Sequence, residues 1–228
     1  MKPALAIFAK TPAAGKVKTR LTPPLSPEES AELYRCMLLD TVARMAPLHI
    51  DTFVFYHGER EFFDAAIPGL PLIPQAGDCL GKRLEHAFTA LFALGYDARV
   101  VIGSDAPDLP LPFVRQAFDL LSEGRDAVFG PAEDGGYYLV GLRNGHGCLF
   151  RGIPWSGPLV LETSLAIARR EGFDSYLLPN WYDVDSPADL HRESLSDPAN
   201  GAQLTREFLR KLGIDAAQTA ALRYSSCS

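Results

Sequence analysis

Positive charge is concentrated near the start of a chain of 228 residues whose formal net charge is −6. The stretch "AIFAKTPAAGKVKTRL" (6–21) carries Lys10, Lys16, Lys18 and Arg20. Gly15 allows close backbone approach, so the loop can offer N–H groups to a phosphate while its side chains add charge and bidentate donors. A solvated basic turn is the alternative. The stretch is not a Walker P-loop, because neither GKS nor GKT occurs in it.

Carboxylates follow the most apolar segment of the chain, in "VVIGSDAPDLP" (100–110). Placing Asp105 beside a buried strand costs stability unless a cation or hydrogen bonds satisfy it. A divalent ion that also binds phosphate oxygens would be a natural partner. For Asp108 the competing interpretation is a helix cap, since a helix is expected over 111–124.

A second acidic pair occurs in "WYDVDSPADL" (181–190), where Asp183 and Asp185 are two residues apart. In an extended segment this spacing puts both side chains on the same side. Paired carboxylates repel one another unless a cation or donors intervene. Together with Asp105 they could complete a magnesium site, although an aspartate before Ser-Pro also occurs in ordinary turns.

A glycine-rich turn in "FGPAEDGGYYLVGL" (129–142) is the third unusual loop. Asp-Gly between two apolar runs predicts a hairpin, and Gly135 and Gly136 permit backbone geometry that other residues resist. The same turn could shape the wall of a pocket. Tyr137 and Tyr138 alternate, so that one faces the core and the other faces a ligand.

The elements that must position these loops alternate between strands and helices through the first ~130 residues. This pattern predicts an α/β fold with a mostly parallel mixed sheet and helices on both faces. Ligands then bind beyond the carboxyl ends of the strands. The helix expected after the basic loop has strong start signals, with Ser26 as cap, Pro27 in the first position and Glu29 completing a capping box.

Composition restricts the function further. Hydrophobic residues make up 47% and charged residues 22%, which is typical of a globular protein with a good core. The acidic net charge argues against general binding to nucleic acid or to anionic membranes. No apolar run approaches the ~20 residues that cross a bilayer, and four scattered cysteines without a CxxC motif suggest reduced thiols in the cytoplasm. We expect one domain over 1–199 and a helical extension over 200–228.

Four blocks, in this order, resemble the bacterial DUF2064 group: "FAKTPAAGKVKTRL", "GSDAPDL", "GPAEDGGYYLVGL" and "WYDVDSPADL". The resemblance covers about residues 4–192. The group's "GDLGxR" block stands here as "GDCLGKRL" (77–84), with Cys79 as an extra residue. The group is similar to glycosyltransferase family A folds within the nucleotide-diphospho-sugar transferase superfamily, which implies a Rossmann-like sheet.

The resemblance also implies roles for individual residues. Asp105 would be the metal-binding aspartate for Mg²⁺ or Mn²⁺, with Asp185 as a second contact. Lys16 and Arg20 would match the phosphate-binding basic pair. The remaining predicted nucleotide or phosphate contacts are Lys10, Gly15, Lys18, Gly81 and Arg83. Asp105 and Asp134 are the predicted catalytic residues, and the predicted acceptor pocket comprises Gly135, Gly136, Tyr137 and Trp155.

Two transferase chemistries suit these residues, because both depend on positioning and charge stabilisation. We place first the Mg-dependent transfer of a glycosyl group from a nucleotide-sugar to a small-molecule acceptor. The alternative is a nucleotidylyltransferase that uses a nucleoside triphosphate and releases pyrophosphate, which the many cations of the first loop favour. A non-catalytic nucleotide-binding module is the third hypothesis. The sequence assigns neither nucleobase, sugar, acceptor nor oligomeric state.

Overall fold

The computed structural model describes residues 1–143, 147–155 and 157–214, and these fall into two compact units. The sheet unit consists of Met1–Thr11, Pro47–Gly103 and Pro110–Tyr182. The helical unit consists of Pro12–Ala46, Ser104–Leu109 and the chain from Asp183 onward. Each unit is built from segments that are far apart in the sequence.

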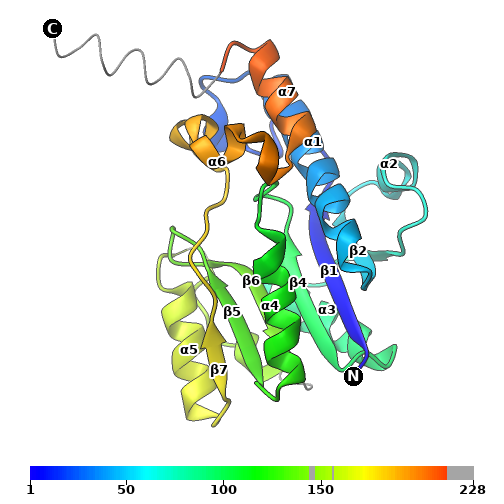
Figure 1. The fold of residues 1–228 in the computed structure, drawn as a ribbon, viewed down its shortest axis with the longest axis vertical. Helices are drawn as coiled ribbons and strands as arrows, with labels where there is room; N and C mark the ends of the chain where they lie inside the picture. The colour runs from blue at the N-terminus through cyan, green and yellow to red at the C-terminus, as the bar shows by residue number, and fades with distance from the viewer. Residues whose placement is uncertain (144–146, 156, 215–228) are drawn as a thin grey trace, which may run out of the picture. The chain divides into compact units, whose positions relative to one another are not determined.

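The sheet unit is organised around a mixed sheet with the order β3-β2-β1-β4-β6-β5-β7 (Figure 1). Its strands are β1 (Pro3–Lys10), β2 (Asp51–His57), β3 (Leu72–Pro74), β4 (Ala98–Gly103), β5 (Ala127–Pro131), β6 (Tyr137–Leu142) and β7 (Ser175–Leu177). Among these described strands β6 runs antiparallel to both neighbours, and the other pairs are parallel. The predicted α/β fold class with a mostly parallel mixed sheet is confirmed.

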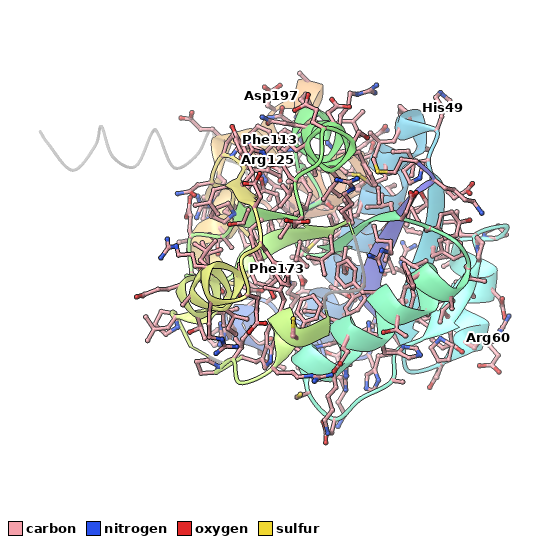
Figure 2. All side chains as sticks on the ribbon, turned by 90° about the horizontal axis from the view of Figure 1, so that it is seen from below. His49, Arg60, Phe113, Arg125, Phe173 and Asp197 are labelled. Atoms are coloured by element: carbon pink, nitrogen blue, oxygen red, sulfur yellow. The ribbon has the colours of Figure 1, made fainter. Side chains whose placement is uncertain are left out.

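Helices cover both faces of this sheet. The α-helices described in this unit are α2 (Arg60–Ala66), α3 (Leu80–Ala93), α4 (Leu111–Ser122) and α5 (Val160–Arg170). One apolar core joins buried side chains of α3, α5 and the short η3 (Gly147–Phe150) to alternate residues of the strands. Figure 2 shows Phe173 on the face of the sheet that α3 and α5 cover, and Phe113 of α4 on the opposite face. Strands that are buried on both faces read as continuous apolar runs, which explains "ARVVIG" in β4.

The helical unit begins with η1 (Thr19–Leu21) and α1 (Pro27–Met45). The predicted capping box of α1 is present: the Glu29 N–H donates to Ser26 Oγ, and the Ser26 N–H donates to the Glu29 carboxylate. Pro27 occupies the first helical position. These interactions satisfy donors that the first helical turn leaves without partners.

The rest of the helical unit comprises η4 (Pro187–His191), α6 (Glu193–Ser196), η5 (Pro198–Asn200) and α7 (Gln203–Lys211). The buried Asp40 of α1 accepts the backbone N–H groups of Leu204 and Thr205 at 3.1 and 2.7 Å. A carboxylate from α1 therefore caps α7 in place of a residue from its own segment. The predicted extension 200–228 begins just before α7. Residues 215–228 lie outside the described residues. The domain boundary at 199 therefore stays a prediction.

Two details concern the ends of helices. Between η4 and α6, Arg192 is in extended conformation. The N-cap residue of α4 is Pro110, two positions after Asp108, where the sequence had suggested Asp108 as a cap. Across the described residues, no helix combines the length and apolar character that a membrane span requires.

Candidate functional site

A buried lysine of the helical unit joins two aspartates. The Nζ of Lys18 lies 2.5 Å from Oδ1 of Asp105 and 2.7 Å from Oδ1 of Asp185. The Lys18 side chain is only 4% exposed, whereas those of Asp105 and Asp185 are 41% and 44% exposed. Burial alone would lower the pKa of Lys18, but the charges of the two aspartates outweigh it and raise the pKa above its ordinary value. Lys18 is therefore a permanent cation at neutral pH.

The loop that carries Lys18 is fixed by local geometry and by α1. Lys18 has a left-handed backbone conformation, with φ 47°, immediately before η1. Its carbonyl accepts the Leu21 N–H at 2.9 Å. The preceding Val17 is buried in a small apolar cluster with Ala31 and Tyr34 of α1. The apolar anchor on one side and the turn on the other direct the lysine inward.

Asp105 is positioned by two contacts of its own segment. The hydroxyl of the neighbouring Ser104 lies 2.8 Å from that of Tyr34, in a buried hydrogen bond. The Asp105 carbonyl accepts the N–H of Val184 at 2.8 Å, which ties the segment 104–109 to the residues beside Asp185. Tyr34 thus supports both the lysine loop, through Val17, and the aspartate segment, through Ser104.

Asp185 is held by the buried carboxylate of Asp189. Oδ2 of Asp189 accepts the backbone N–H groups of Asp185 and Ser186 at 3.2 and 2.8 Å, and the Ser186 hydroxyl at 2.7 Å. Oδ1 of Asp189 accepts Nε of Arg192 at 3.0 Å. Burial would raise the pKa of Asp189, but the hydrogen bonds from Ser186 and Arg192 lower it, so this carboxylate is ionised at neutral pH.

The two aspartates fit a Mg²⁺ or Mn²⁺ ion. Lys18 contacts Oδ1 of each carboxylate, and both side chains keep substantial exposure to water. Mg²⁺ is usually held by one or two carboxylates, several waters and the phosphate oxygens of a substrate. The described residues contain no group of three or more His, Cys, Asp or Glu side chains arranged to hold a metal. The donor set thus suits an ion that arrives with a phosphate ligand rather than an all-protein cage.

The other residues that were predicted to contact the nucleotide or its phosphates are divided between the two units. Lys16 and Arg20 are exposed in the helical unit, as is Gly15, whose φ is +70°. An added Cβ at Gly15 would meet no atom within 4 Å. Lys10, Gly81 and Arg83 belong to the sheet unit. Their roles as phosphate contacts stay predictions.

The predicted acceptor-pocket residues lie in the sheet unit. A Cβ at Gly81 would lie 2.5 Å from Nε1 of Trp155 and 2.6 Å from the Phe150 carbonyl, so the start of α3 packs closely on the indole. Trp155 meets Tyr137 edge-on, with 6.3 Å between ring centroids. Burial raises the pKa of the Tyr137 phenol above its ordinary value, so the hydroxyl is protonated. The role of these aromatic residues in acceptor binding stays a prediction.

The glycine-rich turn joins β5 to the antiparallel β6, as the hairpin signal predicts. Oδ1 of the exposed Asp134 accepts the Gly136 N–H at 2.9 Å. This carboxylate therefore shapes its own turn, and its catalytic role stays a prediction. Gly135 has φ +88°, and its carbonyl accepts the Leu161 N–H at 3.0 Å.

Replacing Gly135 with alanine should destabilise the protein more than the same change at Gly172. Both glycines have positive φ, +88° and +73°. An added Cβ would overlap the Pro158 carbonyl at Gly135, whereas at Gly172 it would meet nothing within 4 Å. We expect a loss of roughly 1 kcal/mol for G172A and about 2–4 kcal/mol for G135A, measured by urea unfolding. Equal losses would show that the turn relaxes away from Pro158.

Two residues that support the site, Tyr34 and Asp189, were not predicted from the sequence. Tyr34 has no distinguishing signal, since an aromatic residue on an apolar helix face reads as core. Asp189 could have been found, because Ser186 and Asp189 have the spacing of a capping box in "SPAD". Asp108 was interpreted as a helix cap or metal ligand, but it is fully buried near Arg44, whose Nε donates to the Leu109 carbonyl at 2.6 Å.

Comparison with known proteins identifies the family. Residues 38–157, more than half of the chain, match the family model described as an uncharacterized protein conserved in bacteria, DUF2064. The chain belongs to this family. The resemblance expected from the four sequence blocks is thereby confirmed.

Several named proteins are similar to this member of DUF2064. A 2-phospho-L-lactate guanylyltransferase of Methanothermobacter thermautotrophicus is 29% identical over 200 residues, 86% of this chain and 85% of its own. A crystal structure from Desulfovibrio desulfuricans, assigned to the nucleotide-diphospho-sugar transferases, is 34% identical with a TM-score of 0.84, covering 94% of this chain and 99% of its own. A cytidylyltransferase of Leptospira borgpetersenii shares the fold at 14% identity and a TM-score of 0.56, covering 93% and 95%. The relatives are named transferases, in agreement with the predicted enzyme class.

Proposed function

We propose that this DUF2064 protein is a nucleotidylyltransferase. It would transfer a nucleoside monophosphate from a nucleoside triphosphate to a small acceptor and release pyrophosphate. The observation that carries the proposal is the Lys18–Asp105–Asp185 cluster, in a chain that resembles a guanylyltransferase over 86% of its length. GTP is therefore the first donor to test.

The charges of the helical unit suit this reaction. A triphosphate brings several negative charges, and pyrophosphate carries them away as the leaving group. Lys16 and Arg20 are exposed cations in the same loop as Lys18 and would contact phosphate oxygens. Lys18, which is buried and always charged, would hold the two carboxylates in one arrangement before substrate binds. Preorganised charge of this kind is usually the largest contribution to phosphoryl-type transfer.

Asp105 and Asp185 would hold a divalent ion through their exposed carboxylates. When bound, such an ion neutralises negative charge on phosphate oxygens and orients the group that is transferred. Tyr137 and Trp155, which belong to the sheet unit, are proposed as acceptor contacts, and Asp134 of the same unit is proposed as a general base. A small-molecule acceptor is proposed, without assignment of its identity.

Glycosyl transfer from a nucleotide-sugar is the second candidate, and the assignment of the D. desulfuricans relative favours it. Both reactions place a diphosphate beside a divalent ion. They differ in the bond that breaks, which is Pα–O–Pβ in nucleotidylyl transfer and the anomeric C–O bond in glycosyl transfer.

A two-sided screen tests the proposal. The protein with Mg²⁺ is incubated with each nucleoside triphosphate and a panel of small phosphorylated or hydroxylated acceptors, and pyrophosphate is measured. In parallel it is incubated with nucleotide-sugars, and nucleoside diphosphate is measured. We expect acceptor-dependent pyrophosphate release that chelation of the metal abolishes. Diphosphate release from a nucleotide-sugar would establish the second candidate, and nucleotide binding without either product would indicate a binding module.

A further inference from the structure

Three basic side chains of the sheet unit gather at the ends of two neighbouring strands. Lys10 is the last residue of β1 and His57 is the last residue of β2. The two residues are partners in the parallel register, so their side chains leave the sheet on the same face. Arg83 lies in the first turn of α3, which follows the short β3 in the chain.

Gln75 links Arg83 to these strand ends. Its amide nitrogen donates to the carbonyls of Ala9 and Phe55 at 3.3 and 2.8 Å. Its amide oxygen accepts a guanidinium N–H of Arg83 at 3.4 Å, while Nε of Arg83 donates to the Gly77 carbonyl at 3.1 Å. A neutral amide thus brings a guanidinium to the edge of β1 and β2 without cancelling its charge.

The charged groups that act on His57 are cations. Burial, then the charge of Arg83 on α3, then that of Lys10 on β1 lower the pKa of His57 below its ordinary value. Asp78, a carboxylate in the loop before α3, is paired with Lys82 at 2.8 Å.

Beyond His57, the next charged residues along the chain are Glu59, which is exposed, and Arg60, which pairs with Asp64 at 3.2 Å. Cationic side chains near the ends of two neighbouring strands, in a chain of net charge −6, are an arrangement that a bound anion would stabilise.

We propose that Lys10, His57 and Arg83 form a subsite for an oxyanion, the phosphate or carboxylate group of a substrate. The inference rests on the proposed function only in taking that anion to be part of a substrate. His57 adds a third positive charge when it is protonated, so the subsite binds its anion more tightly as the pH falls through the histidine range, and a bound anion in turn favours protonation of His57.

Histidine proton NMR of the intact protein tests this subsite without any turnover. Sulfate is the probe, because its charge is constant between about pH 5.5 and 8, where histidine titrates. His57 is assigned from the spectrum of H57Q, and the exposed His49 serves as an internal reference. We expect sulfate to raise the pKa of His57 by at least about half a pH unit relative to chloride at the same ionic strength, and to leave that of His49 unchanged.

Matched variants separate the subsite from general charge effects. R83Q should abolish the sulfate response of His57. K2Q removes the same type of charge just before the other end of β1 and should keep the response. Equal sulfate effects on His57 and His49, or a full response in R83Q, would overturn the proposal. Either result could occur in a fully active transferase, so it leaves the proposed reaction standing.

A second titration identifies the source of the anion. The sulfate series is repeated with Mg²⁺ and a non-hydrolysable nucleoside triphosphate at saturation. If the nucleotide itself raises the pKa of His57 and removes the sulfate response, the subsite holds a phosphate of the nucleotide. If sulfate still acts, the subsite holds the anionic group of the acceptor. Both results support the subsite, and they assign it to different substrates.

Discussion

Changing Asp105 to asparagine is expected to lower transferase turnover by about 10²–10³-fold, the usual effect of removing one preorganised electrostatic group. The substitution keeps the size of the side chain and an oxygen that can accept from Lys18, but it removes the charge that a divalent ion needs. We also expect the variant to need at least about tenfold more Mg²⁺ for half-maximal activity, since the carboxylate that we propose as a ligand of the ion is lost. Initial rates of product release over a Mg²⁺ series measure both effects.

The fold should survive this change. Asp105 is 41% exposed, and Lys18 keeps Asp185 as a partner at 2.7 Å, so the expected loss of unfolding free energy is at most about 1 kcal/mol. D119N, which makes the same chemical change on the exposed surface of α4, is the matched control and should retain normal rates. Wild-type activity and Mg²⁺ dependence in D105N would rule out the metal-binding role of Asp105.

Changing Lys18 to methionine should produce the largest loss of stability among the charged residues of the site. Methionine has a similar length but no charge, so the carboxylates of Asp105 and Asp185 would lie close together without a cation between them. We expect a loss of about 2–3 kcal/mol, in the lower part of the range for breaking a buried ion pair, because both carboxylates are partly solvated. Urea unfolding at neutral pH measures it, and activity should fall together with the arrangement of the carboxylates.

The loss in K18M should come from repulsion between two carboxylates that have no cation between them. Adding D105N to K18M should therefore recover part of the loss. K16M, at an exposed lysine of the same loop, should cost less than about 0.5 kcal/mol, and a similar cost for K18M would contradict the buried-pair interpretation.

Local signals predicted much of the secondary structure. The capping box of Ser26 and Glu29 and the hairpin turn at Asp134-Gly135 were readable because each depends on residues only a few positions apart. The alternation of strands and helices was likewise sufficient for the α/β class, since parallel strands need helical crossovers. Local signals of this kind do not predict interactions between residues that are distant in the chain, as the capping of α7 by Asp40 illustrates.

The sequence alone therefore determined which residue types are available for chemistry and in which loops they stand: basic groups after β1, aspartates after β4 and near residue 185, and glycines between β5 and β6. Only the tertiary structure decided their partners. Lys18 is 87 residues from Asp105 and 167 from Asp185 in the chain, and no periodicity or spacing records such a contact. It forms because burial of one ammonium group is tolerable only where packing brings carboxylates to it, and that packing is a property of the folded unit.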